Sequence, residues 1–270
     1  MTSSITASTP DHLVIVACHA IFLGQPDSPD CDVYDAQQWH LQSFQKPTGT
    51  IPGEHETFLQ HIYAGLSALA YGSISRSSVL VFSGAATALD VTGLTEAQSY
   101  FNAAVALTQR LGQGHPFAEC FKSRTFLDEN ATDSYQNLLF SILKFRRHFG
   151  RYPRTVRVIT HAFKTKRFLD LHAKAIRWPS DRIHVQGIDP VSRAVDHAQN
   201  VDGESKRGLS AWTQDLYGMH PPLADKRVAR GWQPSVLQDL GEGLEDDVKA
   251  LLAYDGGKDG NRPFEGPLPW

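Results

Sequence analysis

The stretch VLVFSGAAT, residues 79–87, is followed at 95–111 by a segment with helical spacing. Residues 79–82 form a short apolar run, typical of a strand that is buried on both faces of a parallel sheet. Ser83 and Gly84 break this run, and Thr95 with Gln98 forms a capping pair at the start of the helix. A strand, a small-residue loop and a helix in this order favour an α/β fold.

The same alternation continues on both sides of this stretch. A short apolar run predicts a further strand at 13–18, and the segments TVRVIT and RIHVQGI predict strands at 155–160 and 182–188. Further helices are predicted at 55–71, 132–149 and 163–178. We therefore expect a Rossmann-like, doubly wound α/β fold: a mostly parallel sheet with right-handed crossovers, helices on both faces and a C-terminal appendage. In open sheets of this kind ligands bind outside the carboxyl ends of the strands, here in the loops after Cys18, Phe82 and Ile159.

The length of 270 residues and the weaker alternation after Asp189 predict the domain organisation. Residues 1–11 are expected to be a disordered N-terminus, and residues 12–199 the Rossmann-like domain. Residues 200–270 are expected to be an appendage that packs on or near this domain. Its acidic stretch 244–252 is compatible with a helix.

Several classes of protein are disfavoured by composition. The apolar runs fall far short of the roughly 20 residues of a membrane-spanning helix, and residues 1–11 have neither a basic nor an apolar signal-peptide region. The widely spaced Cys18, Cys31 and Cys120 suit a reducing compartment. We expect a cytoplasmic protein with no membrane span, and the sequence carries no signal for an oligomeric state.

Positive charge is concentrated in one part of the chain, although the net charge is -3. Residues 144–182 contain 12 basic and 2 acidic side chains, whereas residues 1–143 contain 5 basic and 13 acidic ones. The basic side chains either converge on phosphate or carboxylate groups or are scattered over the surface and paired with the acidic half. Nucleic acid is a disfavoured partner, because the total charge is negative and no aromatic platform or helix-turn-helix pattern occurs.

The common catalytic signatures are missing from the sequence. After His55 and Glu56 the next histidine is His61, which is the wrong spacing for a zinc-binding helix. The sequence contains neither GxSxG nor GxxxxGK[ST]. No metal site is predicted.

Polar residues nevertheless gather where the predicted strands end. The candidate ligand-binding residues are His19, Ser83, Gly84, Asn137, Thr160, His161, Lys164 and Arg167, and the candidate catalytic residues are Glu96 and Glu129. The Ser-Gly turn offers hydroxyl and backbone N–H donors beside a helix N-terminus, which suits an anion. Lys164 and Arg167 at the start of a helix repel its dipole and favour a compensating anion. Glu96 or Glu129 would bind hydroxyl or amine groups, or act as an acid or base.

A structural role competes with several of these assignments. The Ser-Gly pair can simply make a turn, Glu96 and Asp133 can serve helix N-termini, and His19 can be a core histidine. Asn137 is expected mainly to brace the loops, because a buried Asn needs hydrogen-bond partners. In the appendage, a solvated face or a cap over the pocket is expected of Lys226, Arg227 and Arg230.

Four segments in order resemble the motifs of a known family. They are VFSGAAT at 81–87, TEAQSY at 95–100, DENATDSYQN at 128–137 and VITHAFKTKRF at 158–168. They resemble the Ser-Gly-Gly loop, the Glu-Ala helix start, the acidic Asn-Thr-x-x-Asn segment and the Val-Thr-Ser-x-x-His-x-x-Arg junction of the YdcF-like family. This superfamily includes the SanA and ElyC envelope proteins, and the resemblance covers roughly residues 12–190.

The sequence departs from these motifs at three points. Ala85 replaces the second loop glycine, Asp133 and Ser134 replace the Asn-Thr pair, and Lys164 stands where the family has its histidine. The segments Cys18-His19-Ala20 and DLYGMHPPLADKR at 215–227 resemble the soluble, chiefly fungal branch. The resemblance implies a Rossmann-like fold and, from a bacterial member, S-adenosylmethionine as a ligand. Chemistry assigned to the family histidine does not carry over.

We therefore expect a binder of a small anionic ligand of the nucleotide or S-adenosylmethionine type, with transferase or hydrolase activity. Lys164 and Arg167 would hold the anion, and Glu96 or Glu129 would be the general base. The alternative is a non-catalytic ligand sensor or interaction scaffold, because the family histidine and any nucleophile motif are missing.

Overall fold

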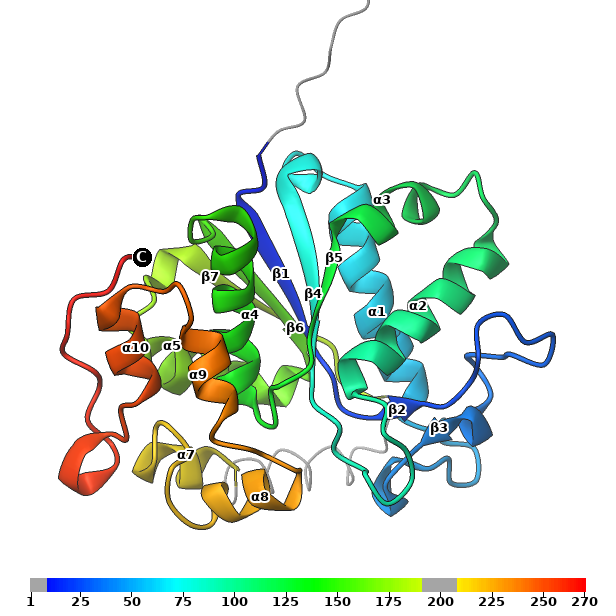
Figure 1. Ribbon diagram of the computed structural model, residues 1–270. Coiled ribbons are helices and arrows are strands. Elements are labelled where there is room, and N and C mark those ends of the chain that lie inside the picture. The colour runs from blue at the N-terminus through cyan, green and yellow to red at the C-terminus, as the bar shows by residue number, and fades with distance from the viewer. Residues whose placement is uncertain (1–8, 191–207) are drawn as a thin grey trace, which may run out of the picture.

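The computed structural model describes residues 9–190 and 208–270, and at its centre lies a parallel sheet of five strands (Figure 1). The strands are β1 (His12–Ala17), β4 (Ser78–Ser83), β5 (Thr125–Asp128), β6 (Thr155–Thr160) and β7 (Ile183–Gly187). Their order is β5-β4-β1-β6-β7, and every neighbouring pair is parallel. The predicted parallel α/β fold is confirmed.

The order of the strands changes direction beside β1. From β1 the chain adds β4 and β5 on one side, and it then adds β6 and β7 on the other side. The topological switch point therefore lies between the carboxyl ends of β1 and β6, which is where ligands bind in open α/β sheets.

Helices cover both faces of the sheet (Figure 1). One face carries α1 (His55–Ala70), α2 (Glu96–Leu111) and α3 (Pro116–Arg124), and the other carries α4 (Ser134–Phe149). Successive residues of a strand point to opposite faces. Val14 and Val16 of β1 consequently join the core beneath α1 and α2, whereas Leu13 and Ile15 join the core beneath α4.

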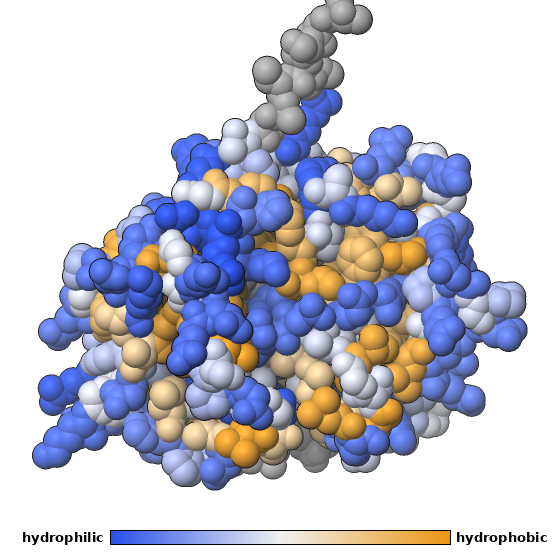
Figure 2. Space-filling model, in the orientation of Figure 1, coloured by the Kyte–Doolittle hydropathy of each residue, from blue (hydrophilic) through white to orange (hydrophobic). Residues whose placement is uncertain are grey.

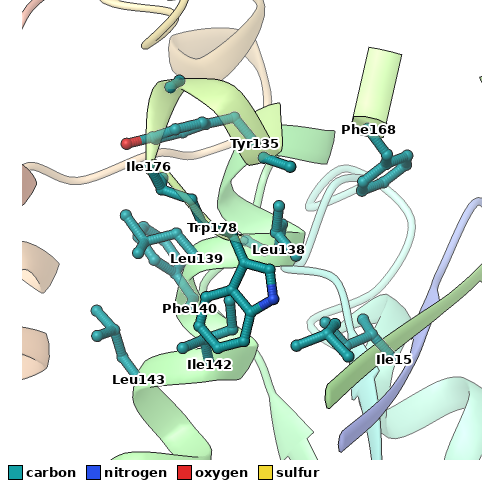
Figure 3. Close-up of a cluster of buried hydrophobic side chains, with 14 of the residues drawn as sticks. Ile15, Tyr135, Leu138, Leu139, Phe140, Ile142, Leu143, Phe168, Ile176 and Trp178 are labelled. Atoms are coloured by element: carbon teal, nitrogen blue, oxygen red, sulfur yellow. The ribbon is translucent and has the colours of Figure 1, made fainter. Parts of the chain in front are cut away.

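The core beneath α4 holds the sheet to its covering segments. In Figure 3, Leu138 and Ile142 of α4 belong to a cluster with Ile15, Phe168 and Trp178. All five side chains are at most 4% exposed. Burial of apolar surface contributes roughly 25 cal/mol per Å², so this contact stabilises the α4 layer on the sheet.

Residues 208–270 pack on the α4 side of the sheet. Their helices are α7 (Ser210–Gln214), α8 (Leu223–Ala229), α9 (Val236–Gly241) and α10 (Asp246–Leu252). Trp212, Tyr217 and Leu251 belong to the same core as α4, and α10 falls within the stretch predicted to be helix-compatible. Figure 2 shows mostly hydrophilic residues on this side, as expected of helices that bury one face only.

Two expectations about domain organisation concern residues that the structure largely leaves out. Most of the predicted disordered N-terminus, and the predicted boundary at residue 200, lie outside the described residues.

The structure corrects the prediction of one regular helix at 163–178. The chain there forms a 3-10 turn (Ala162–Lys164), a π-helical turn (Arg167–His172) and the short α5 (Ala173–Ala175). Apolar spacing does not distinguish a regular helix from a succession of tighter and wider turns. The 3-10 turn also lies tightly against β7, where only the missing side chain of Gly187 leaves room for the backbone of Ala162.

Four short elements before residue 190 are among those that were not predicted. β5 is a short edge strand, α3 begins with Pro116 after its N-cap His115, and β2 (Ile21–Phe22) pairs antiparallel with β3 (Trp39–His40). These elements are two to nine residues long. They are therefore too short for a clear periodic pattern.

Candidate functional site

A cavity of about 600 Å³ lies at the carboxyl ends of the strands. His19, which follows β1, and Thr160, at the end of β6, line it at the switch point. Further walls come from the segment around β2 and β3, from the starts of α1 and α4, and from α8. In Figure 1 the β2–β3 segment and α8 lie on opposite sides of the same end of the sheet.

His19 connects the ends of β1 and β6. Its Nε2 lies 3.1 Å from the Oγ1 of the fully buried Thr160, and its Nδ1 lies 3.3 Å from the Nζ of Lys164. Burial, and after it the positive charge of Lys164, lowers the pKa of His19 well below its ordinary value. His19 is therefore a neutral imidazole that holds Thr160 and Lys164 at the cavity.

Four basic side chains line the cavity: Lys164, Arg167, Lys226 and Arg230. The Nη1 of Arg167 donates to the Oγ of Ser134 over 3.3 Å, and the Nη1 of Arg230 donates to the carbonyl of Thr132 over 2.6 Å. Ser134 is the first residue of α4, where the helix dipole also favours negative charge. Positive potential from several elements thus converges beside the start of α4.

A buried ion pair positions α8. The Nε of Arg227 lies 2.5 Å from the Oδ2 of Asp133, and their side chains are only 5% and 13% exposed. Asp133 also caps α4, because its Oδ1 accepts from the backbone N–H of Gln136. The expectation of a solvated face was wrong for Arg227, and the alternative of a tail at the pocket holds, since Lys226 and Arg230 line the cavity.

The two candidate catalytic carboxylates have different surroundings. Glu96 lines the cavity, and its Oε1 accepts from the hydroxyl of Thr87 over 2.6 Å. Burial raises the pKa of Glu96, and Thr87 and the cations Arg230 and Lys164 oppose this. Glu129 is exposed, does not line the cavity, and accepts a hydrogen bond from Thr95 over 2.9 Å.

The Ser-Gly turn braces the floor instead of presenting donors to a ligand. Ser83 is fully buried, and its hydroxyl donates to the Oδ2 of Asp128 over 2.6 Å. The backbone N–H groups of Gly84 and Ala85 donate to the carbonyls of Asp128 and Ala131. The expected ligand donors are used within the fold, because β4 and β5 are tied together there. A Cβ at Gly84 would lie 2.8 Å from the Cβ of Glu96, so glycine is required for α2 to begin so close to the turn.

Asn137 has the bracing role predicted for it. Its Nδ2 donates to the carbonyl and to the Oγ of Ser83, over 3.0 and 2.9 Å. It also reaches the cavity wall, although it is only 7% exposed. Asn137 thus joins the cavity wall to the buried network of Ser83 and Asp128.

Several cavity residues were missed from the sequence, among them Ser134 and Glu54. Ser134 was considered only as part of a family motif, whereas in the structure it lines the cavity. Glu54 precedes α1, which the β2–β3 pair separates from the end of β1 along the chain. The position of Ser134 at a predicted helix N-terminus was an available signal, but no local pattern marked Glu54.

His161, a predicted ligand contact, also lines the cavity and is 3% exposed. Thus the structure brings together His19, Asn137, Thr160, His161, Lys164, Arg167 and Glu96 at the cavity wall. Ser83 and Gly84 lie beneath it, and Glu129 lies away from it.

Residues 9–190 and 208–270 contain neither a metal-binding cluster nor a membrane-spanning helix. No cluster of three or more His, Cys, Asp or Glu side chains is placed to hold a metal ion. No helix in these ranges is long and apolar enough to cross a membrane.

Comparison with known proteins adds one relative. The chain is 28% identical over 258 residues to a protein of Saccharomyces cerevisiae, "Uncharacterized protein YOR238W". The similarity covers 81% of this chain and 82% of the yeast protein. No protein-family model matches the chain, and no solved structure matches it.

Proposed function

We propose that the chain is a YdcF-like protein whose cavity binds the anionic group, phosphate or carboxylate, of a small ligand of the nucleotide or S-adenosylmethionine type. The observation that carries this proposal is the convergence of Lys164, Arg167, Lys226 and Arg230 on one cavity at the switch point. Arg and Lys neutralise phosphate and carboxylate groups with charge-assisted hydrogen bonds. The cavity volume of about 600 Å³ suits a ligand of that size.

The acidic residues of the cavity only partly offset these cations. Asp133 is paired with Arg227. Burial raises the pKa values of Glu54 and Glu96, which makes their carboxylate forms less favourable than in water. An anionic group is consequently the ligand charge that this cavity stabilises best.

The proposal includes transfer or hydrolysis, with Glu96 as the general acid or base. Burial raises the pKa of Glu96 at the cavity wall, which makes this carboxyl a candidate for proton exchange with a ligand. Glu129 is the weaker candidate, because it lies outside the cavity. A Glu96→Gln protein should bind the ligand but lose turnover.

A non-catalytic ligand sensor is the second candidate function. The only serine hydroxyl among the described cavity-lining residues belongs to Ser134 and lies 2.7 Å from the Nε2 of His172. Burial, then Arg167 and Arg227, lowers the pKa of His172 well below its ordinary value. His172 is therefore a weak base for activating a nucleophile, which favours hydrogen bonding by Ser134 over covalent catalysis.

Calorimetric titration with pyrophosphate, ADP and S-adenosylmethionine tests the proposal. We expect at least one of these probes to bind, and Lys164→Ala to weaken it by about tenfold or more, as loss of a charge-assisted hydrogen bond implies. Lys166→Ala is the matched control, because Lys166 is exposed in the same segment and does not line the cavity. Folded protein that binds none of the three probes would refute the proposal.

Turnover separates the two candidate functions. Release of phosphate from nucleotides and sugar phosphates, and methyl transfer from S-adenosylmethionine, would be measured for the wild type and for Glu96→Gln. Turnover that Glu96→Gln abolishes supports the enzyme. Ligand binding without turnover in either assay supports the sensor.

A further inference from the structure

His161 is a buried polar side chain without hydrogen-bond partners in the part of the chain that the structure describes. It is 3% exposed and lines the cavity, and neither ring nitrogen has a partner there. The Oε2 of Glu54 lies 3.9 Å from the Nε2 of His161, which is beyond hydrogen-bond distance. Buried polar groups are normally paired, so both nitrogens of His161 are available to a ligand in the cavity.

The chemical form of His161 defines the partner that it would accept. Burial, then Lys164 and His61, lowers the pKa of His161 well below its ordinary value. The ring is therefore neutral and offers one N–H donor and one nitrogen acceptor. A neutral group that both donates and accepts hydrogen bonds complements both nitrogens, whereas a fully ionised phosphate only accepts and would satisfy the N–H alone.

The surroundings of His161 add uncharged groups to the cationic part of the cavity, and Lys164 Nζ lies 5.8 Å from the centroid of the neighbouring Phe163 ring. Its ring stacks on Phe163, with centroids 4.9 Å apart and an angle of 21° between the planes. Glu54 and Gln45 also line this part, and the backbone N–H of Glu54 donates to the carbonyl of Gln45. We call Gln45, His161 and Phe163 the neutral subsite, and Glu54 lies at its edge.

The neutral subsite adjoins the cations through His19. The rings of His19 and His161 have centroids 4.5 Å apart, and Lys164 Nζ lies 3.3 Å from His19 Nδ1. One small molecule can therefore reach both regions, with its anionic group at Lys164 and its uncharged part at His161.

We propose that the neutral subsite binds an uncharged ring bearing a hydrogen-bond donor and an acceptor, carried by the anionic ligand, and that His161 is the residue that selects for this ring. The inference rests on the proposed function. The ligand class is a phosphate or carboxylate attached to a sugar or to a heterocyclic base. An inorganic anion would occupy only the cationic part.

Calorimetric titration of His161 variants with ligands that carry the ring and with pyrophosphate, which does not, tests this assignment. His161→Phe should weaken binding of ADP or of sugar phosphates at least tenfold and leave pyrophosphate binding unchanged. His161→Gln keeps a donor and an acceptor, so it should retain more ADP or sugar-phosphate affinity than His161→Phe. His184→Phe is the matched control, because His184 is exposed and does not line the cavity. Thermal unfolding verifies that each variant is folded.

The outcomes distinguish failure of this inference from failure of the proposed function. If wild-type protein binds pyrophosphate but His161→Phe does not change the affinity for any ring-bearing phosphate, the neutral subsite is refuted and the anion site stands. If folded wild-type protein binds no probe, both proposals fail. Titration with ribose 5-phosphate separates the two ring types. If His161→Phe weakens the affinities for ribose 5-phosphate and ADP equally, the subsite binds the sugar. If it weakens only the affinity for ADP, the subsite binds the base.

Discussion

The Nε2 of His19 lies 3.1 Å from the Oγ1 of Thr160, across the carboxyl ends of β1 and β6. These strands are neighbours, and the order of the sheet reverses between them. The contact therefore joins the two walls of the cavity at the switch point. It also orients the imidazole whose Nδ1 lies beside Lys164.

Thr160→Val should loosen this junction. The substitution preserves the shape of the side chain and removes the hydroxyl, so we expect the free energy of unfolding to fall by about 1 kcal/mol. We also expect weaker pyrophosphate binding, because His19 no longer holds Lys164. Urea denaturation and calorimetry measure the two effects.

Thr155→Val is the matched control for that change. The Oγ1 of Thr155 lies 2.7 Å from the Nδ1 of His12, at the opposite end of the same strand pair. It should affect stability without changing pyrophosphate affinity. Identical affinities of Thr160→Val and wild type would show that the His19–Thr160 contact has no part in ligand binding.

Ser83→Ala should destabilise the fold. The change leaves the buried carboxyl of Asp128 and the amide of Asn137 without the hydroxyl to which both are bonded. Urea denaturation should show a loss of about 1 to 3 kcal/mol. Ser141→Ala should be neutral or stabilising, because Ser141 is also fully buried and its hydroxyl has no partner among the described residues. Equal losses in both variants would contradict a bracing role for Ser83.

Arg227→Leu should release α8 from the start of α4. Removing one member of a buried ion pair typically costs about 3 to 5 kcal/mol, since the other charge stays buried. The α4 dipole partly compensates Asp133, so we expect the lower end of that range. Hydrogen exchange should show faster exchange in α8 than in α1. Unchanged protection of α8 would mean that apolar contacts alone hold it.

Acid should destabilise the protein through its buried histidines. Burial lowers the pKa of His61 from 6.5 to about 4, so between these values the unfolded state binds a proton that the folded state does not. The contribution of His61 to the free energy of unfolding is fully present above pH 6.5. As pH falls from 6.5 toward 4, this contribution decreases by about 1.4 kcal/mol per pH unit. The pKa values of His19, His161 and His172 are shifted in the same direction. Asp128 opposes this, because its pKa is raised to about 6 and its contribution to stability decreases as pH rises.

The His61→Phe variant isolates the contribution of one histidine. The free energy of unfolding, measured by urea denaturation from pH 4 to 7, should fall less steeply toward low pH in the variant than in the wild type. Parallel curves for the two proteins would show that His61 does not titrate differently in the folded and unfolded states.

The amino-acid sequence by itself determined the class of fold and its main elements. Residues 13–16 form an apolar run, and residues 155–160 are rich in β-branched side chains. Residues 134–149 carry helical spacing, with Asp133 as the cap. These are local patterns that follow from burial on one or two faces. They also placed His19, Thr160 and Lys164 correctly at the ends of β1 and β6, because parallel strands end at the same edge.

Only the tertiary structure decided which distant groups meet. Glu54 lies near His161 across 107 positions of sequence, and the ion pair of Arg227 with Asp133 spans 94. No local period encodes such contacts. Likewise, the hydroxyl of Ser83 could donate a hydrogen bond to a ligand or to a neighbouring strand. It donates to Asp128 because β5 pairs with β4 in the folded chain. Hydrogen bonds and burial depend on packing in three dimensions, whereas the sequence pattern reports only which face each side chain occupies.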